Sequence, residues 1–265
     1  MPELPEVEYF TQYFNETSLN QPIADVTCKT AALLKKTSIK TLKKVLRGKQ
    51  FKQGYRRGKF LIAEIKNDPH NLIFHFGMTG SLAYGINNDF TDREKKYAQL
   101  IIEFKNGHQL RWINVRKFGT VYLATTVNTI STLKNMGPEP LSLSQQQFLD
   151  LLTLHEPKNI KSFLMDQSDI AGIGNEYSNE ILFQAGIDPH KVIANLPLKD
   201  RKKLYKIMQH VLKKAIAIGR PYGNFPNSWL LAHKSDLLCP RNKKYHLVKE
   251  KIAGRSALYC PKYQS

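Results

Sequence analysis

Residues 160–189 read IKSFLMDQSDIAGIGNEYSNEILFQAGIDP. Apolar residues recur at helical spacing in Ile160–Met165 and again in Asn175–Phe183, and a glycine turn, Gly172-Ile173-Gly174, separates the two segments. Free backbone N–H groups and the amide side chain of Asn175 meet at the start of the second helix, so the stretch predicts an anion site. A capped helix after a tight turn is the simpler interpretation, and the same geometry serves both.

The rest of the second half also has a helical period. Beyond Pro138-Glu139-Pro140, apolar residues recur at i, i+3 and i+4 in Gln145–Leu154 and in Lys199–Ile218. This half is therefore predicted to be a bundle of helices.

The first half has a different period. One helix is predicted at its start, where Pro5 suits a first turn and Glu3, Glu6 and Glu8 lie at the positive end of the helix dipole. Its apolar face consists of Leu4, Val7, Phe10 and Phe14. Short β-branched or aromatic runs follow, separated by Gly, Asn and Asp, which is typical of an antiparallel sandwich. These runs are Ile23–Cys28, Phe60–Ile65, Leu72–Phe76, Gln99–Phe104, Gln109–Asn114 and Thr120–Ala124.

Together the patterns predict an α+β fold. An N-terminal antiparallel β-sandwich preceded by a helix is expected over residues 1–125, and a linker over 126–144. A C-terminal helical domain is expected over 145–236, and a short basic tail over 237–265. A length of 265 residues with 42% hydrophobic residues suits about two domains with real cores.

Composition points to a polyanionic partner. The chain has 40 Lys and Arg against 22 Asp and Glu, a net charge of +18, and 17 of these cations against three acids lie in 191–265. Nucleic acid and an anionic membrane surface both suit this balance. Three cysteines make no disulfide framework, and we find neither a signal peptide nor a membrane-spanning run, so a cytoplasmic protein is expected.

The N-terminal MPELPEVE carries candidate chemistry. Removal of Met1 would leave Pro2 with a secondary amine that can attack an aldehyde-like carbon. Glu3 is adjacent and Glu6 is one helical turn further on, so two carboxylates are available for general acid and base work. Taken alone, these residues fit an ordinary acidic helix start equally well.

Six ordered blocks nevertheless resemble the formamidopyrimidine-DNA glycosylase and endonuclease VIII family, on its formamidopyrimidine branch. The blocks are MPELPEVE at the start, RRGKF (56–60), HFGMTGSL (75–82), NVRKFG (114–119), MGPEPL (136–141) and the stretch 160–189. The resemblance implies a bifunctional enzyme that removes an oxidised base from damaged double-stranded DNA and then cuts the strand by β,δ-elimination. It makes 145–236 a helix–two-turn–helix domain and 237–265 a finger hairpin, in a monomer without membrane contact that associates with the nucleoid.

The resemblance also assigns catalytic roles. It makes Pro2 the nucleophile that forms a Schiff base with the sugar, and Glu3 the acid that helps to open the sugar ring. Glu6 would orient the base or the nucleophile. Lys59, in the turn before the Phe60–Ile65 strand, would meet a phosphate or the oxygen of the lesion; the alternative is an ordinary solvated lysine.

Further residues are matched to DNA contacts. Met78, Arg116 and Phe118 correspond to the trio that fills the space left by the extruded nucleotide, although Met78 and Phe118 as sandwich core is the alternative. Asn175 corresponds to the residue that grips the phosphate flanking the lesion. Lys161 would be a second phosphate contact.

The tail departs from the family. Most members end in a zinc finger with two Cys-x-x-Cys pairs, whereas this chain has Cys239-Pro-Arg-Asn242 and Cys260-Pro-Lys-Tyr263. Two thiolates do not close a zinc site, and the spacing of His233 and His246 suits no familiar ligand pattern, so we expect no cofactor and a zincless finger. Arg255 still matches the finger arginine that enters the groove. Apolar residues on either side of the Ala253–Ser256 turn are expected to pack the hairpin against Lys199–Ile218; they are Leu247, Val248, Ile252, Leu258 and Tyr259.

The substrate is less sharply indicated than the reaction. The segment between Gly219 and Cys239 is shorter than the loop that caps 8-oxoguanine in the family, whereas Leu4 favours the formamidopyrimidine branch. Oxidised purines, 8-oxoguanine and formamidopyrimidines, are the leading expectation. Oxidised pyrimidines or hydantoins are the alternative, and a non-catalytic protein that binds damaged DNA is an alternative of another class.

Overall fold

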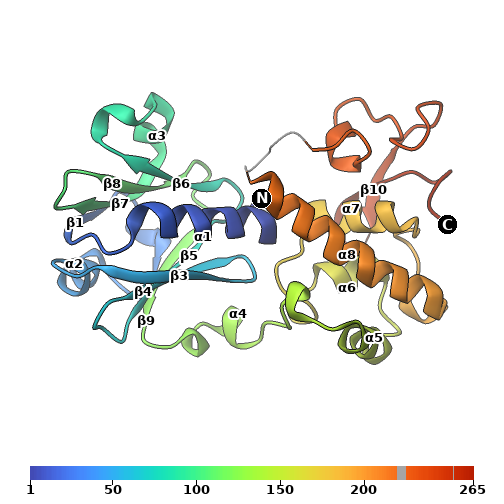
Figure 1. Cartoon of the computed structure of the whole chain (residues 1–265), viewed down its shortest axis with the longest axis horizontal. Coiled ribbons are helices and arrows are strands. Elements are labelled where there is room, and N and C mark those ends of the chain that lie inside the picture. The colour runs from blue at the N-terminus through green and yellow to red at the C-terminus, as the bar shows by residue number, and fades with distance from the viewer. Residues whose placement is uncertain (220–224, 253) are drawn as a thin grey trace. The chain divides into compact units, whose positions relative to one another are not determined.

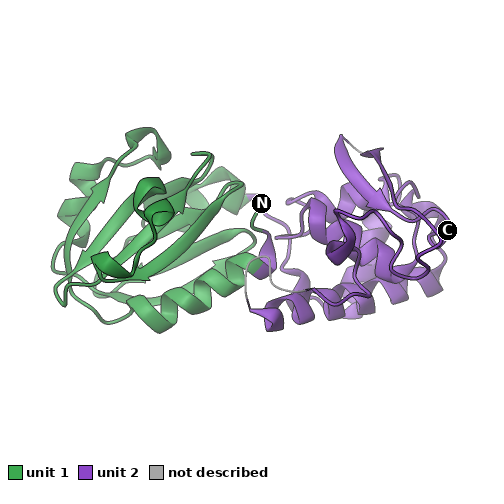
Figure 2. Ribbon diagram, turned by 90° about the horizontal axis from the view of Figure 1, so that it is seen from above, with its two compact units in different colours: residues 1–2, 6–134 green, residues 3–5, 135–265 purple. Residues whose placement is uncertain are grey.

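A computed structural model of the chain describes residues 1–219, 225–252 and 254–265. Two compact units divide it: residues 1–2 and 6–134 form the first, and residues 3–5 and 135–265 form the second (Figure 2). Part of the short segment after Gly219, and Ala253 of the expected hairpin turn, lie outside the described residues. No helix within the described ranges is long and apolar enough to cross a membrane.

The first unit is a sandwich of two sheets (Figure 1). One sheet has the order β1-β7-β8-β6 and the other has the order β2-β9-β5-β4-β3. Side chains from both sheets share one apolar core, which includes Phe74 and Trp112. The strands are β1 (Ile23–Cys28), β2 (Leu34–Lys35), β3 (Phe51–Arg57), β4 (Phe60–Ile65), β5 (Asn71–His75), β6 (Gly80–Gly85), β7 (Ala98–Phe104), β8 (Gln109–Asn114) and β9 (Thr120–Ala124).

Helices cover the sides of this sandwich. Phe10 and Phe14 of α1 enter its core, and Asn15 of α1 bonds the edge strand β3, its Nδ2 donating to the Gly54 carbonyl at 3.0 Å. On another side, α2 buries Leu42 and Leu46 and packs against the edge strand β1. The helices of this unit are α1 (Leu4–Ser18), α2 (Ile39–Leu46), α3 (Asp92–Tyr97) and α4 (Ser131–Lys134).

The described residues of the second unit include four α-helices and one hairpin. The helices α5 (Gln145–Leu154), α6 (Ile160–Met165), α7 (Asn175–Ala185) and α8 (Leu198–Ile218) share an apolar core. The hairpin strands β10 (Val248–Ile252) and β11 (Arg255–Tyr259) pair antiparallel, and β11 packs against α7. Gly186 ends α7 in the left-handed conformation, with φ of 70°, which favours glycine.

The α+β prediction is confirmed, with local corrections. β1, β4, β8, β9, α5 and α6 have the predicted bounds. One pair, β2 with β9, is parallel, so the sandwich is not wholly antiparallel. The helices α2 and α3 and the strand β6 were not predicted. Leu4 belongs to the core of the second unit and not to the one that receives Phe10 and Phe14.

Candidate functional site

The start of helix α7 holds the carboxylate of Glu3. The backbone N–H groups of Gly174, Glu176 and Tyr177 donate to its two oxygens, at 2.6, 2.9 and 3.3 Å. Only 1% of Glu3 is exposed. Unpaired N–H groups and the helix dipole both favour negative charge at this point. The predicted anion site therefore exists, but a carboxylate of the chain itself fills it.

The glycine turn lets Glu3 reach α7. Gly172 has φ of +82°, and a Cβ on it would lie 2.8 Å from the Cβ of Leu4. The Leu4 N–H donates to the Gly172 carbonyl at 2.9 Å, which ties the N-terminal residues to the turn. The expectation that Glu3 complements the dipole of its own helix is thus corrected: it serves α7, about 170 residues away along the chain.

Lys161 lies beneath the same helix start. It is fully buried, and its ammonium donates to Asn175 Oδ1 at 3.1 Å, Ser178 Oγ at 3.1 Å and Asn179 Oδ1 at 2.5 Å. Burial lowers the pKa of Lys161 to about 8, although the charge of Glu3 acts in the opposite direction. Lys161 was predicted to contact a phosphate; in this structure its three donors bond three protein oxygens, and the phosphate contact stays a prediction. Lys161 thus fixes the amide of Asn175, whose NH2 group is left to donate elsewhere.

In the first unit, two loops present an exposed trio. Met78 and Phe118 are 40% and 57% exposed, and the guanidinium of Arg116 lies 5.0 Å from the centre of the Phe118 ring. The alternative that Met78 and Phe118 are sandwich core is therefore wrong. A Cβ on Gly77 would lie 2.5 Å from the backbone nitrogen of Gly119, so the two loops touch through glycine backbone. This contact holds the three side chains together at one end of the sandwich.

Lys59 lies in the two-residue turn between β3 and β4. It is only 8% exposed, so the solvated-lysine alternative is wrong. His75 on the paired strand packs its ring against that of Phe60 in a tilted arrangement, with centroids 4.7 Å apart. Burial, and then the charge of Lys59, lower the pKa of His75 to about 4. His75 is thus a neutral imidazole beside a cation. His75 was not selected from the sequence; its position at a strand end, just before the Met78 loop, is the sequence feature that could have indicated it.

Pro2 and Glu6 are also buried. Glu6 lies in the first turn of α1 and belongs with Pro2 to the first unit, whereas Glu3 belongs to the second. The carboxylate that α7 holds is therefore the chain neighbour of the candidate nucleophile.

The hairpin at the C-terminal end of the chain has a buried apolar core. The thiols of Cys239 and Cys260 are buried in a cluster with Phe183 of α7. The remaining members of the cluster are Leu230, Leu247 and Leu258. Burial, and then the adjacent Cys239, raise the pKa of Cys260 to about 11, so the buried thiol is protonated near neutral pH.

An aromatic and cationic group closes this core. The ring of Tyr263 lies 5.2 Å from that of Phe183, and the guanidinium of Arg241 lies 5.3 Å from the Tyr263 ring and 5.6 Å from the Phe183 ring. Arg241 also donates to Gln184 Oε1 at 2.6 Å. In the described ranges no three His, Cys, Asp or Glu residues gather as ligands, and a finger without zinc stays a prediction. The expected support from α8 is corrected, since the cluster contains residues of α7 and none of α8.

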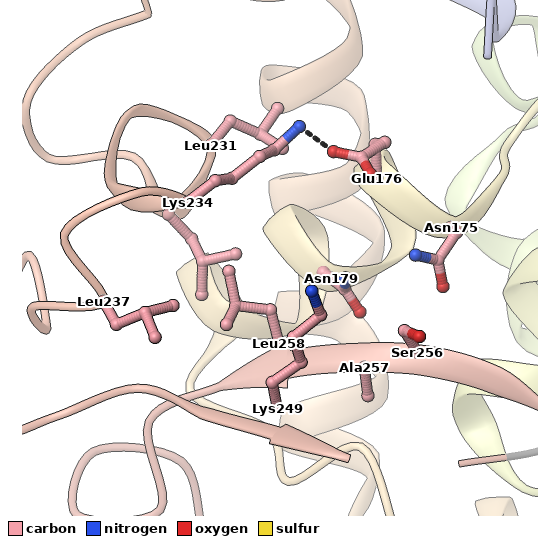
Figure 3. A pocket seen from close by; sticks show the side chains of 11 residues that line it. Asn175, Glu176, Asn179, Leu231, Lys234, Leu237, Lys249, Ser256, Ala257 and Leu258 are labelled. Atoms are coloured by element: carbon pink, nitrogen blue, oxygen red, sulfur yellow. Dashed lines mark ion pairs between the residues drawn. The ribbon is translucent and has the colours of Figure 1, made fainter. Parts of the chain in front are cut away.

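A pocket of about 200 Å³ lies between α7 and β11 (Figure 3). Asn175 and Asn179 line one wall, and Ser256, next to the exposed Arg255, lines another. The cations of Lys234 and Lys249 also border it. Lys234 forms an ion pair with Glu176, drawn as a dashed line in Figure 3. Neither lysine was singled out from the sequence, where only the positive charge of the tail indicated them.

Family comparisons agree with these features. Residues 1–121 match the formamidopyrimidine-DNA glycosylase N-terminal domain, and residues 136–224 match the formamidopyrimidine-DNA glycosylase H2TH domain. The formamidopyrimidine-DNA glycosylase of Shouchella clausii is 31% identical, over all of this chain and 99% of the relative. That of Desulforamulus reducens is 30% identical over the same shares.

Solved structures of formamidopyrimidine-DNA glycosylases are also similar to this chain. A crystal structure of Lactococcus lactis formamidopyrimidine-DNA glycosylase, bound non-covalently to DNA with an AP site, superposes with a TM-score of 0.86 at 32% identity, covering 99% of both chains. Another, of the enzyme from the same organism with FAPY-dG containing DNA, gives 0.87 at 31% identity, covering 99% of this chain and all of that one. The chain belongs to the formamidopyrimidine-DNA glycosylase family.

Proposed function

We propose that this chain is a bifunctional DNA glycosylase and AP lyase that removes oxidised purines from duplex DNA in base-excision repair. The observation that carries the proposal is the buried Glu3 carboxylate, held by three backbone N–H groups and directly following Pro2 in the chain. A fixed acid beside an amine nucleophile is what the first step requires.

The chemistry begins at Pro2. After Met1 is removed, the neutral amine of Pro2 attacks the anomeric carbon of the damaged nucleotide, and the bond to the base breaks. The base leaves with the bonding electron pair and takes a proton from water. Glu3, whose three N–H donors favour the carboxylate, accepts the proton that the Pro2 nitrogen loses and then delivers it to the ring oxygen of the sugar. The ring opens and an iminium on Pro2 results. Glu6 orients the nucleophile.

Strand cleavage follows from the iminium. It acidifies the neighbouring carbon, so elimination expels the 3′ phosphate and then the 5′ phosphate. Hydrolysis releases the enzyme. Lys59, a buried cation beside the neutral His75, receives a phosphate or the oxygen of the lesion.

The DNA contacts divide into positioning and readout. Asn175, its amide oriented by Lys161, donates to the phosphate that flanks the lesion. Met78 and Phe118 fill the space of the extruded nucleotide, and Arg116 bonds the orphaned base. Extrusion costs a few kcal/mol of unstacking, which these contacts offset.

The finger delivers Arg255 without metal. The apolar core around Cys239 and Cys260, closed by Tyr263 and Arg241, supplies the stability that four ligands give in a zinc finger.

The active species is a monomer of 30.4 kDa that works in the cytoplasm on nucleoid DNA. Sedimentation of the purified protein should return the mass of one chain.

Borohydride trapping tests the proposal. With DNA containing an abasic site, reduction should attach the DNA to the N-terminal peptide, and Pro2→Gly should weaken the adduct sharply. Retention of Met1 in the active protein, or an adduct on Lys59, would contradict the role of Pro2.

A lesion panel separates the alternatives. Trapping should be strongest on duplexes with 8-oxoguanine or formamidopyrimidines. Stronger trapping on oxidised pyrimidines or hydantoins would favour the endonuclease VIII-like preference. Tight binding without any adduct would favour a non-catalytic damage-binding protein.

A further inference from the structure

Positive charge has a second concentration, in the first unit. Between Asp25 and Glu64 the chain has 12 Lys and Arg and no Asp or Glu. This segment spans β2, α2 and β3. Surfaces that only serve solubility usually intersperse both signs of charge, so a segment of one sign this long points to an external anion.

Part of this charge is exposed on β2 and on the neighbouring element in the chain, α2. Lys35 on β2 and Lys40 and Lys44 on α2 are exposed, and we call them the α2 lysine surface. Lys43 and Arg47 differ, because both bond Asp25, at 2.9 and 2.8 Å. Within the described part of the chain, no carboxylate lies at ion-pair distance from the three lysines of the surface.

This arrangement is unfavourable in the isolated protein. Lys40 and Lys44 are four residues apart on one helix, where like charges repel each other. Lys40 also lies in the first turn of α2, at the positive end of its dipole, and that turn has no acid to balance it. The helix persists because Leu42 and Leu46 are buried. A bound polyanion would relieve both repulsions.

Within this surface, Lys40 and Lys44 on α2 lie away from the predicted lesion contacts of this unit, whereas Lys35 lies opposite Tyr122 near the middle of β9. The residue after α2, Arg47, leads within four residues to Phe51 at the start of β3 (Figure 1). β3 then runs to the turn with Lys59, and Phe60 pairs with His75 just before the Met78 loop. Seven strand residues span about 20 Å, so the end of α2 and the Met78 loop lie at opposite ends of the sandwich.

We propose that the α2 lysine surface binds the phosphates of a second segment of duplex DNA, distinct from the segment in which the lesion is processed. DNA is favoured over a membrane because the apolar residues Leu42 and Leu46 of α2 face inward, so this helix has no apolar face to insert among lipids. Holding two segments lets the enzyme pass from one duplex to another without release. The proposal relies on the proposed function only in taking DNA as the polyanion at hand.

A triple substitution tests it. Lys35→Gln, Lys40→Gln and Lys44→Gln together remove three charges, and Lys66→Gln, Arg93→Gln and Lys105→Gln remove three exposed charges elsewhere in the same unit as a matched control. Binding to undamaged duplex is measured across salt concentrations. The log–log salt slope should become shallower by about 2–3 in the triple variant, at about 0.9 per phosphate contact, and by under about 0.5 in the control.

Direct transfer is the second measurement. Enzyme loaded on one labelled duplex should dissociate faster as a second, unlabelled duplex is added, and the triple variant should lose most of this acceleration. Thermal melting reports folding, and the single change Lys44→Glu should move slope and transfer in the same direction if the triple variant melts early. Equal slopes in triple and control variants would overturn the proposal, as would lost binding to phosphatidylserine vesicles with an unchanged DNA slope. Failure of the wild-type enzyme to cut lesions would instead count against the proposed function and leave these binding results intact.

Discussion

The two halves of helix α7 support different parts of the molecule through different interactions. Its N-terminal end holds Glu3 with three backbone N–H groups and holds Asn175 through the buried ammonium of Lys161. Its C-terminal half supports the finger through Phe183, by apolar and aromatic packing. Directional hydrogen bonds fix atoms for chemistry, whereas packing needs only shape and volume. The first region should therefore respond to isosteric changes that the second tolerates.

The largest effect is expected at Glu3. Glu3→Gln keeps the volume but removes the charge and turns an NH2 group toward backbone donors, so base release should fall by about 10²–10³-fold. Binding to lesion duplex should change by less than about threefold. Single-turnover glycosylase assays and fluorescence anisotropy measure the two quantities. Glu16→Gln, at an exposed position of α1, is the control, and equal losses in both variants would remove the contrast between the two halves of α7.

Arg255 should come next. Arg255→Ala removes an exposed hairpin side chain and no packing, so we expect activity to fall by about 10²-fold with an unchanged melting temperature.

Elemental analysis of the wild-type protein should find well under one zinc per chain, and chelator should leave cleavage unchanged. Stoichiometric zinc lost together with activity would point to Cys239, His246 and Cys260 as an unorthodox site.

A smaller effect is expected from the aromatic closure of the finger. Tyr263→Ala removes a ring packed on Phe183 and Arg241, and should lower the free energy of unfolding by about 2 kcal/mol. Urea titration measures this change. Tyr263→Phe keeps the ring and should be nearly neutral, unlike the isosteric Glu3→Gln. If the two Tyr263 variants were equally damaging, packing would not be what holds the finger.

The smallest effect concerns pH. The pKa of Lys161 is lowered to about 8 from its usual 10.5, so the ammonium loses a proton, and one of its three donors, as pH rises through about 8. DNA binding through Asn175 should weaken several-fold between pH 7 and 9, and anisotropy at constant salt measures it. Lys161→Met should flatten this dependence.

The same lowered pKa bears on stability. The pKa of Lys161 in the folded protein lies below its value in the unfolded chain. Burying the charged ammonium therefore destabilises the fold fully below about pH 8, and this cost disappears above about pH 10.5. The contribution of Lys161 to folding therefore improves as pH rises between these values, opposite in sign to the change expected in binding. The melting temperature and DNA binding could instead both fall as pH rises, and fall equally in the Lys161→Met variant. That result would show that groups other than Lys161 cause both changes.

The sequence by itself determined the periodic elements and the family. Alternation and helical spacing are local properties, so strands such as β4 and β8 and helices such as α5 and α6 could be predicted with their bounds. The resemblance of six short blocks indicated the roles of Pro2, Glu3 and Asn175. Each Cys-x-x-Cys pair lacks its second cysteine, at Asn242 and Tyr263, and this predicted a finger without zinc.

Only the tertiary structure decided which groups meet. A carboxylate at residue 3 and the N–H groups of residues 174–177 are joined by hydrogen bonds that no local pattern records. Packing likewise made the buried Lys161 a partner of Asn175, and left Met78 and Phe118 exposed where isolated apolar residues favour a core. Solvent access and long-range contact depend on the packing of distant segments, and that is why periodicity and spacing could not supply them.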